Sequence, residues 1–357
     1  EQLNEKTPNT RKYKMARMTA VYLPGNKQVD VRTAIVPEPG PDEVLVEIKA
    51  SCICRSDLSL YYGNAVISGG NSDEFVCGHE PAGIVVKTGE AVTEFKEGDN
   101  VAVYLAVGCG VCHHCRTGHN YLCEKWKCLG FTMDGGNAEF MKVPARNLLK
   151  TPKGMSHLAA AISTDAFGTL VSACRKVGVN GLSKIGIWGL GPMGAAGTLA
   201  AKAMGGKVLV LDPIKERREF ATKLGADLAL DPTDPFALDV IKEFTNGEGL
   251  SGAIDCSGNS LAHNMALEAA APMAKIALIG ENKETTLKTS DHLIRKQLTV
   301  FGSWYFSIHE YEEIIQLIDT HKIDLERLVT HTFDLKEAAR AFQMFDNRDT
   351  EKAVFVR

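Results

Sequence analysis

The sequence predicts an α/β protein of two domains, a β-barrel-like domain and a doubly wound parallel sheet. The chain has 357 residues, more than a single hydrophobic core usually organises. Its first half contains short β-rich runs separated by turn residues, and its second half alternates strands with helices. With 45% apolar and 24% charged residues, the composition excludes a disordered or fibrous chain.

The first half predicts several short strands between Met18 and about Lys150. The breaks between them are Pro-Glu-Pro-Gly-Pro at 37–41 and Lys-Glu-Gly-Asp at 96–99. Residues 1–17 are polar and aperiodic, so we expect a loose arm there. Strands are expected at 19–23, 42–50, 83–86 and 100–103.

After Ala159 strands and helices alternate, the pattern of a parallel doubly wound sheet. Strands are expected at 184–188, 208–211, 253–255 and 276–279. Helices are expected at 195–204, 213–224 and 261–271. The last 50 residues predict an amphipathic helix near 308–320 and a strand at 353–356.

Charge and cysteine content restrict the partners and the compartment. A net charge of −4 gives no electrostatic reason to expect nucleic acid or an anionic membrane. No run approaches the roughly 20 apolar residues of a membrane span, and the N-terminal dozen residues do not resemble a signal peptide. Ten cysteines, half of them assignable to metal, fit a reducing compartment, so we predict a cytoplasmic protein.

Four of these cysteines form a compact metal-binding pattern. Cys109, Cys112, Cys115 and Cys123 are separated by two gaps of two residues and one of seven. One loop can therefore arrange four thiolates around a tetrahedral zinc ion. A closed Cys₄ shell leaves no open position for chemistry, so this zinc is expected to be structural. Disulfides or free buried thiols are the alternatives.

A glycine-rich turn follows the strand at 184–188. Gly189, Gly191 and Gly194 form G-x-G-x-x-G, and Pro192 and Met193 within this motif are further candidates for binding the cofactor. This context predicts a dinucleotide pyrophosphate at the helix N-terminus. Asp212 ends the next strand, where a carboxylate accepts from ribose hydroxyls and repels a 2′-phosphate. We therefore expect NAD, although Lys215 and Arg217 nearby keep NADP open.

Several motifs together resemble the zinc-containing medium-chain alcohol dehydrogenases, from about Met18 to the C-terminus. They are Cys-Arg-Ser-Asp at 54–57, Gly-His-Glu at 78–80, Asp-Gly-Gly-Asn-Ala-Glu-Phe at 134–140, the four cysteines and the glycine turn. The resemblance implies a GroES-like catalytic domain of residues 18–164 and 303–357, with a structural-zinc lobe at about 108–124. Residues 165–302 would form a Rossmann NAD-binding domain.

The resemblance also implies a second, catalytic zinc with an open position. Cys54 and His79 would be its first two ligands. Asp165 occupies the place where several branches have a cysteine, and Cys174 is a chemical rival. Glu80 is expected to ligate the metal when substrate is absent, or to contact the metal ligands and hold them in place.

Four residues near the ligand Cys54 acquire roles by the same resemblance. Ser56 would accept the proton of the substrate hydroxyl, and Asp57 would orient His79 through its far ring nitrogen. Arg55 would reach the cofactor pyrophosphate. Ser59 stands where many relatives have a relay histidine, so the rest of the proton path is open.

The expected reaction is hydride transfer between a secondary alcohol and NAD. The motifs are most similar to the branch that oxidises polyols, cyclitols and related small hydroxy compounds, in a homodimer or homotetramer. An aldehyde reductase or formaldehyde-dehydrogenase-like enzyme is the alternative, and a non-catalytic zinc- and NAD-binding sensor is a third. Candidates for lining the substrate site are Leu58, Tyr61, Phe131, Trp304 and Tyr305.

Overall fold

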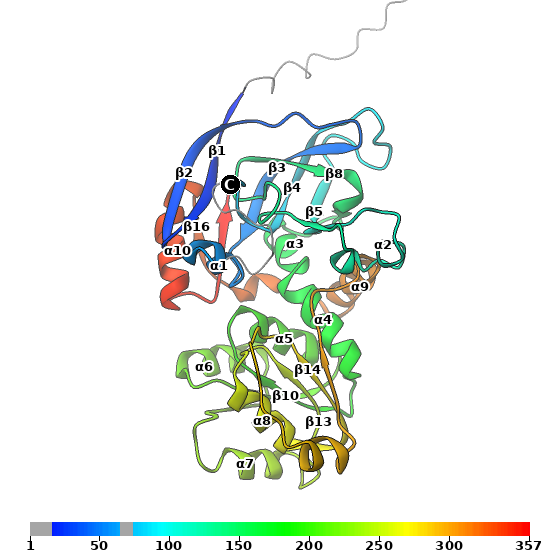
Figure 1. The fold of residues 1–357 in the computed structure, drawn as a ribbon, viewed down its shortest axis with the longest axis vertical. Helices are drawn as coiled ribbons and strands as arrows, with labels where there is room; N and C mark the ends of the chain where they lie inside the picture. The colour runs from blue at the N-terminus through cyan, green and yellow to red at the C-terminus, as the bar shows by residue number, and fades with distance from the viewer. Residues whose placement is uncertain (1–15, 65–73) are drawn as a thin grey trace, which may run out of the picture. The chain divides into compact units, whose positions relative to one another are not determined.

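The computed structural model describes residues 16–64 and 74–357, which fall into two compact units (Figure 1). Unit 1 contains the residues up to Thr164 together with Val329–Arg357, and unit 2 is Asp165–Leu328. Of the predicted N-terminal arm, residues 1–15 lie outside the described residues. Arg17 already belongs to the first strand, β1.

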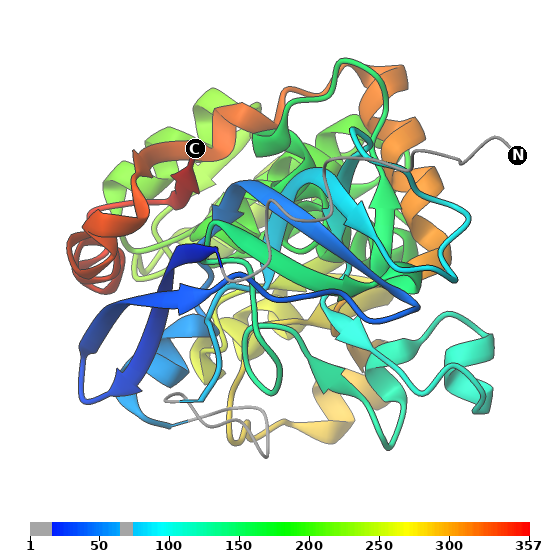
Figure 2. The same cartoon turned by 90° about the horizontal axis from the view of Figure 1, so that it is seen from above.

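Unit 1 is mainly β-structure, and the chain's final strand completes its largest sheet. That sheet has the order β16-β17-β3-β4-β5-β9, and β8 also pairs with β3. The pairs β1–β2 and β6–β7 form two small sheets, and helix α10 lies beside β2 (Figures 1 and 2). The strands are β1 Arg17–Gly25, β2 Gln28–Ile35, β3 Glu43–Cys52, β4 Glu80–Thr88, β5 Asn100–Val103, β6 Ala106–Val107, β7 Lys127–Cys128, β8 Phe140–Pro144, β9 Leu148–Lys150, β16 Val329–Phe333 and β17 Lys352–Val356. The helices are α1 Asp57–Tyr62, α2 His113–Arg116, α3 His157–Ser163 and α10 Ala338–Asn347.

Alternation along β3 explains how this sheet encloses a core. Val44, Val46 and Ile48 point into one cluster with Val101, Val103 and Met141, whereas Leu45 packs into a second cluster with Ala20 and Val76. The period of two places successive side chains on opposite faces. Because both faces of β3 are covered, the strand is apolar along most of its length.

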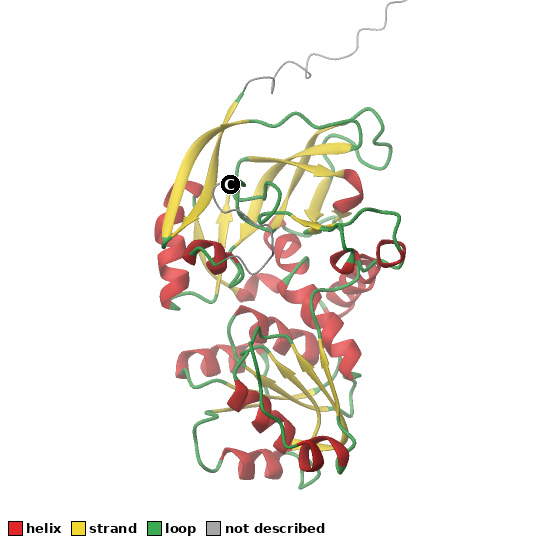
Figure 3. Cartoon of the chain, viewed as in Figure 1, coloured by secondary structure: helices red, strands yellow, loops and turns green. Residues whose placement is uncertain are grey.

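Unit 2 is a parallel sheet with helices on both faces (Figure 3). Its order, β12-β11-β10-β13-β14-β15, reverses direction between β10 and β13, the arrangement of a Rossmann fold. The strands are β10 Lys184–Trp188, β11 Lys207–Leu211, β12 Leu228–Leu230, β13 Leu250–Asp255, β14 Ala270–Leu278 and β15 Thr299–Gly302. The helices are α4 Ala166–Val177, α5 Pro192–Ala203, α6 Lys215–Leu224, α7 Ala237–Phe244, α8 Ser260–Ala269 and α9 Tyr311–His321.

Residues 303–328 belong to unit 2 in the structure, whereas we expected them in the catalytic domain. Contacts with α4 explain the difference. Ser172 Oγ donates to Glu310 Oε2 over 3.0 Å, and Lys176 Nζ lies 3.2 Å from Ser303 Oγ. Arg175 also forms an ion pair with Glu313. Helix α9 is therefore attached to the helix that begins unit 2.

The helices of the described residues can be compared with the length and hydrophobicity of a membrane span. Within residues 16–64 and 74–357, no helix has both the length and the apolar character that crossing a membrane requires.

Candidate metal and dinucleotide sites

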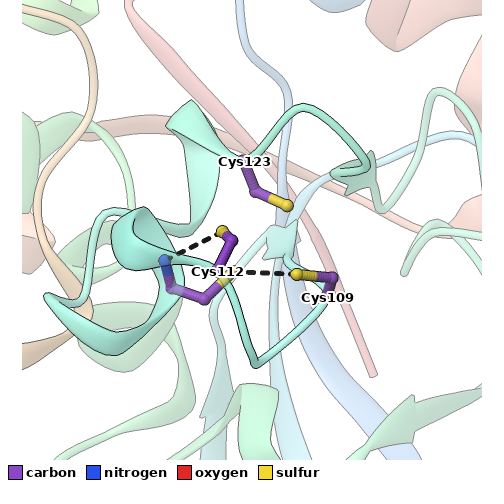
Figure 4. Close-up of side chains that lie close together, drawn as sticks. Cys109, Cys112 and Cys123 are labelled. Carbon is purple, nitrogen blue, oxygen red and sulfur yellow. Dashed lines mark hydrogen bonds between the residues drawn. The ribbon is translucent and has the colours of Figure 1, made fainter.

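The four cysteines of the predicted structural site lie close together in one lobe of unit 1. Their sulfur atoms all lie within 4.8 Å of one another, and Cys109 Sγ is 3.9 Å from Cys115 Sγ. Figure 4 shows Cys109, Cys112 and Cys123 pointing toward a common centre. A tetrahedral zinc with Zn–S bonds of about 2.3 Å places its sulfurs about 3.8 Å apart. The donor set therefore fits Zn²⁺ in both chemistry and spacing.

The thiols of this site differ in how readily they lose a proton. Backbone N–H groups of Val111 and Cys112 lower the pKa of the Cys109 thiol to about 6. Burial raises the pKa of the Cys115 thiol to about 12. Four neighbouring thiols cannot all ionise beside one another without a positive charge between them. A bound zinc ion supplies that charge, and the site is closed by its four sulfurs.

The second metal-ligating group is centred on His79, which precedes β4 and is buried. Its Nδ1 lies 3.0 Å from Asp57 Oδ1, and its Nε2 lies 3.2 Å from Ser56 Oγ. Asp57 Oδ2 also accepts from the backbone N–H of Cys54 over 2.9 Å. One buried carboxylate thus orients the imidazole and the turn that carries the cysteine. A carboxylate on the far nitrogen is typical of a metal-bound histidine.

The turn before His79 is held by the Asp-Gly-Gly-Asn segment. Gly78 has φ +93°, and a Cβ there would lie 2.3 Å from Asn137 Oδ1. A Cβ on Gly135 would lie 2.2 Å from the carbonyl oxygen of Gly78. Asn137 is itself fixed, because Ser51 Oγ donates to its Oδ1 over 2.6 Å. The glycines allow a close backbone approach that fixes the position of the histidine.

Cys54, His79, Glu80 and Asp165 each offer one ligand atom, and these atoms lie within 4.8 Å of one another. Asp165 is the first residue of unit 2 and follows Thr164 of unit 1 directly. It occupies the N-cap position of α4, yet its carboxylate does not cap that helix. Its Oδ1 accepts from Thr169 Oγ1 over 3.2 Å. Thiolate, imidazole and carboxylate are ligands that zinc accepts in catalytic sites.

The rival ligand Cys174 does not join this group. It lies within α4, as we expected, and it is fully buried. Burial raises the pKa of its thiol to about 12, so it has the properties of a core residue.

Glu80 forms a buried ion pair that sequence reasoning missed. Lys352 Nζ lies 2.7 Å from Glu80 Oε1 and 2.5 Å from Glu80 Oε2. Glu80 Oε1 is also 4.0 Å from His79 Nε2. Both ends of the pair are almost completely buried. The structure therefore gives Glu80 a partner other than a metal. In the sequence, the one sign of this ion pair is that a lysine begins the apolar strand at the end of the chain.

Ser59 and Arg55 have different surroundings. Ser59 Oγ donates to the carbonyl oxygen of Ser56 over 2.7 Å. This hydrogen bond fixes the side chain of Ser59 in the first turn of α1. Arg55 is exposed. Burial raises the pKa of Asp346, but hydrogen bonds from Lys27 and Tyr62 lower it below its usual value, and the charge of Arg55 contributes to that lowering. Its predicted contact with a pyrophosphate stays a prediction.

Among the five candidates for substrate lining, Phe131 lies near the histidine. Its ring centroid is 5.2 Å from that of His79. Tyr61 instead stacks on Phe342 at 5.8 Å, and Tyr305 packs against Phe306. Leu58 is buried and Trp304 is half exposed. Phe131 is the candidate that these contacts favour.

In unit 2, the glycine turn has the geometry that dinucleotide binding requires. Gly189 has φ +83°, and a Cβ there would lie 2.7 Å from the backbone nitrogen of Ser257. A Cβ on Gly194 would lie 1.9 Å from the carbonyl oxygen of Gly189. Gly191 is the N-cap of α5 and supplies no side chain, and Pro192 and Met193 follow it. The helix N-terminus is thus left to the N–H groups that bind phosphate.

Asp212 lies at the end of β11 and already accepts two backbone hydrogen bonds. Leu190 N–H donates to its Oδ2 and Ile214 N–H to its Oδ1, both over 2.8 Å. Arg217 Nη1 lies 3.9 Å from Asp212 Oδ2, and its guanidinium is 3.8 Å from where a Cβ on Gly191 would be. The side chain of Arg217 is mostly buried. Lys215 is exposed and pairs with Glu219.

Two family matches cover most of these elements. Residues 40–153 match the alcohol dehydrogenase GroES-like domain, and residues 192–320 match the zinc-binding dehydrogenase domain. The first match includes Cys54, His79 and the four-cysteine lobe, and the second begins at Pro192 in the glycine turn.

Similar whole proteins extend the comparison along the chain. The zinc-type alcohol dehydrogenase-like protein YphC of Escherichia coli K12 is 33% identical over 349 residues, 95% of this chain and 99% of that protein. The L-threonine 3-dehydrogenase of Pyrococcus horikoshii is 32% identical over 332 residues, 90% of this chain and 93% of that enzyme. The solved structure of the alcohol dehydrogenase rspB from E. coli CFT073, in complex with NADH, superposes with a TM-score of 0.86. It is 28% identical and covers 96% of this chain and 99% of its own.

Proposed function

Because the chain belongs to the zinc-containing medium-chain alcohol dehydrogenases, we propose that it oxidises a small secondary alcohol of the polyol or cyclitol type with NAD. The observation that carries the proposal is the group formed by Cys54, His79, Glu80 and Asp165, whose ligand atoms lie within 4.8 Å. We propose that the first three ligands of the metal are Cys54, His79 and Asp165. Lys352 holds Glu80 in an ion pair, so a fourth position stays available for substrate.

Zinc bound there supplies Lewis-acid chemistry, because it lowers the pKa of a coordinated hydroxyl. The protein then has to hold the imidazole and remove a proton. Asp57 holds His79 by its Nδ1, which directs Nε2 toward the other ligand atoms. Ser56 Oγ lies 3.2 Å from that Nε2, so its hydroxyl would be a neighbour of an alcohol held by these ligands and their metal. We assign Ser56 as the first proton acceptor.

The substrate class is supported by the relatives. L-Threonine, the substrate in the name of the Pyrococcus horikoshii enzyme, carries its reacting hydroxyl on a secondary carbon. Phe131 beside His79 offers an apolar wall to such a carbon.

The choice of NAD is supported by the carboxylate of Asp212 at the end of β11. A carboxylate at this place accepts from ribose hydroxyls and repels a 2′-phosphate. Each of its oxygens already accepts one backbone N–H, and a carboxylate oxygen can accept a second donor. Arg217 works against the repulsion, because its guanidinium is 3.9 Å from the same carboxylate. We therefore propose a preference for NAD that is moderate in size.

A substrate screen tests the proposal directly. The zinc-loaded protein is incubated with NAD and sugar alcohols, cyclitols, amino alcohols including L-threonine, or simple alcohols, and NADH absorbance is followed. The reverse assay offers aldehydes and ketones with NADH. A Cys54→Ala preparation of the same purity is the control for contaminating dehydrogenases. Oxidation of polyols or cyclitols supports the proposal, turnover of aldehydes alone supports the reductase, and NADH binding without turnover supports a sensor.

Assembly and location complete the proposal. We propose a homodimer or homotetramer, which light scattering during gel filtration measures. The cytoplasmic location stays a prediction from cysteine content.

A further inference from the structure

Unit 2 contains a buried histidine–carboxylate pair that the proposed reaction does not use. His263 Nε2 lies 2.9 Å from Asp255 Oδ2, and both side chains are almost completely buried. The carboxylate also accepts from Ser257 Oγ over 2.5 Å and from the backbone N–H of Gly258 over 2.9 Å. This carboxylate therefore has hydrogen-bond partners on both of its oxygens. A buried polar group with this many partners fixes the positions of the loop and helix to which those partners belong.

Asp255 is placed where a Rossmann fold binds its ligand. It is the last residue of β13 and pairs with Trp188, the last residue of β10. The strand order reverses between these two strands, and dinucleotides bind outside the carboxyl ends at such a switch point. The loop that follows Asp255 therefore borders the proposed cofactor site.

That loop touches the glycine turn itself. Cys256 N–H donates to the carbonyl oxygen of Trp188 over 2.8 Å. A Cβ on Gly189 would lie 2.7 Å from Ser257 N and 2.8 Å from Ser257 Cα. A shift of Ser257 toward Gly189 would therefore collide with the turn, and a shift away from it would leave a gap. The position of Ser257 is in turn set by its two hydrogen bonds to Asp255.

His263 connects this loop to a second one, after β14. Its Nδ1 lies 2.6 Å from Thr285 Oγ1. The two loops also meet through backbone, because a Cβ on Gly280 would lie 2.0 Å from Gly258 N. One imidazole in α8 thus bridges the loops that follow two neighbouring strands of the sheet.

We propose that His263 is a positioning residue for NAD, acting through Asp255 and Thr285 on the loops at the carboxyl ends of β13 and β14. The inference rests on the proposed function, because it takes NAD as the ligand of unit 2. His263 makes its contacts to protein groups, so it acts on affinity for the dinucleotide and not on the proton path. Loss of the imidazole frees the Ser257 loop beside Gly189.

Three substitutions at His263 separate its two contacts. His263→Ala removes both, His263→Gln keeps an amide near the Nε2 position, and His263→Asn keeps one near Nδ1. Thr285→Val removes the second contact and leaves Asp255 untouched. His321→Ala, in the last turn of α9, removes an exposed imidazole from the same unit and is the matched control.

The measurements are NADH affinity by fluorescence titration, zinc content, thermal unfolding, and KM for NAD against kcat. We expect His263→Ala to weaken NADH binding about tenfold, because the Ser257 loop is no longer held beside Gly189 and its ordering then opposes binding. KM for NAD should rise while kcat at saturation and the zinc content stay near wild type. His263→Gln should recover most of the affinity, His263→Asn less, and Thr285→Val should weaken NADH binding about threefold.

Two results would overturn the inference. One is wild-type NADH affinity in His263→Ala. The other is a uniform loss of thermal stability in all three His263 variants without any recovery of NADH binding by glutamine, which would indicate a purely structural role. If the wild-type protein itself does not bind NADH, the proposed function fails first, and the two failures are thereby distinguished.

Discussion

Lys352 Nζ lies 2.7 Å from Glu80 Oε1 and 2.5 Å from Glu80 Oε2, and both side chains are buried beside the metal-ligating histidine. Solvent and salt screen a buried ion pair only weakly. Each partner nevertheless depends on the other, because an isolated buried charge is costly. Breaking the pair is therefore expected to destabilise unit 1, and we propose that Lys352 keeps Glu80 from competing with substrate for the metal.

Lys352→Met keeps the length of the side chain and removes its charge. We expect a loss of about 3–5 kcal/mol in the free energy of unfolding, because the Glu80 carboxylate remains buried without its partner. Turnover should fall as well, since the freed carboxylate can then compete with substrate for the metal. Chemical denaturation and steady-state kinetics measure the two effects.

The double variant Glu80→Gln/Lys352→Met is the control for this interpretation. Removing both charges should recover a large part of the lost stability, as a double-mutant cycle for interacting partners requires. Equal stability of the single and double variants would show that lost packing of the lysine stem, and not the ion pair, is responsible.

Some features of the site follow from local spacing and could be predicted. The four cysteines lie within one loop, so sequence separation alone brings their sulfurs together. The glycine turn is equally local, because Gly189 and Gly194 are joined by one turn of chain. In both cases the chemistry of the residues and their spacing determine the geometry.

Lys352 illustrates what local patterns cannot predict. It is 272 residues from Glu80 in the sequence, and the two meet because β17 and β4 both pair with β3. Neither strand contains a signal for its partner, since period-two alternation gives the faces of a strand but not its neighbours. The same is true of His263 and Thr285, which meet across two loops.

The end of α8 shows a different limit. The alanine-rich run predicts a helix through residue 271, but the helix ends at Ala269 and β14 begins at Ala270. Ala270 pairs with Leu250 of β13, and it is buried. Tertiary pairing overrides the helix propensity of alanine at this boundary.

Our second prediction concerns the metal content. Protein purified without chelator should contain about two zinc ions per chain, one closed and one open. Cys112→Ser should cause unfolding or aggregation, because the lobe loses one of four thiolates. Val111→Ser, an exposed position in the same loop, is the matched control and should fold normally. Elemental analysis measures the zinc content, and circular dichroism measures folding. A folded Cys112→Ser protein with two zinc ions would contradict the structural role of this site.

The third prediction separates the two candidates for the remaining ligand. Asp165→Ala should retain the fold, lose the catalytic zinc and lose activity, because a carboxylate of the metal group is removed. Cys174→Ala should keep both zinc ions, because this thiol is a core residue in α4. If the outcomes are reversed, with zinc and turnover surviving Asp165→Ala, Cys174 becomes the ligand.

The fourth prediction concerns cofactor choice. Asp212→Asn should reduce the preference for NAD over NADP, since the charge that repels a 2′-phosphate disappears. Asparagine keeps an acceptor for only one of the backbone N–H groups of Leu190 and Ile214, so thermal unfolding of the variant must show that the turn persists. Arg217→Gln should have the opposite effect and increase the preference, because it removes a cation 3.9 Å from the carboxylate. The ratio of kcat/KM for NAD and NADP is the measurement; a wild-type ratio that favours NADP would contradict the assignment of Asp212.

The last prediction concerns the proton path. Ser56→Ala should lower kcat by about 10²–10⁴-fold with little change in NADH affinity, the usual effect of losing a positioned proton-transfer group. Ser59→Ala is the matched control and should have a modest effect, because that hydroxyl donates to the carbonyl oxygen of Ser56 and cannot titrate near neutrality as histidine does. A pH–rate profile of both variants distinguishes the roles. Near-normal turnover in Ser56→Ala would remove this serine from the mechanism and leave water as the acceptor of the alcohol proton.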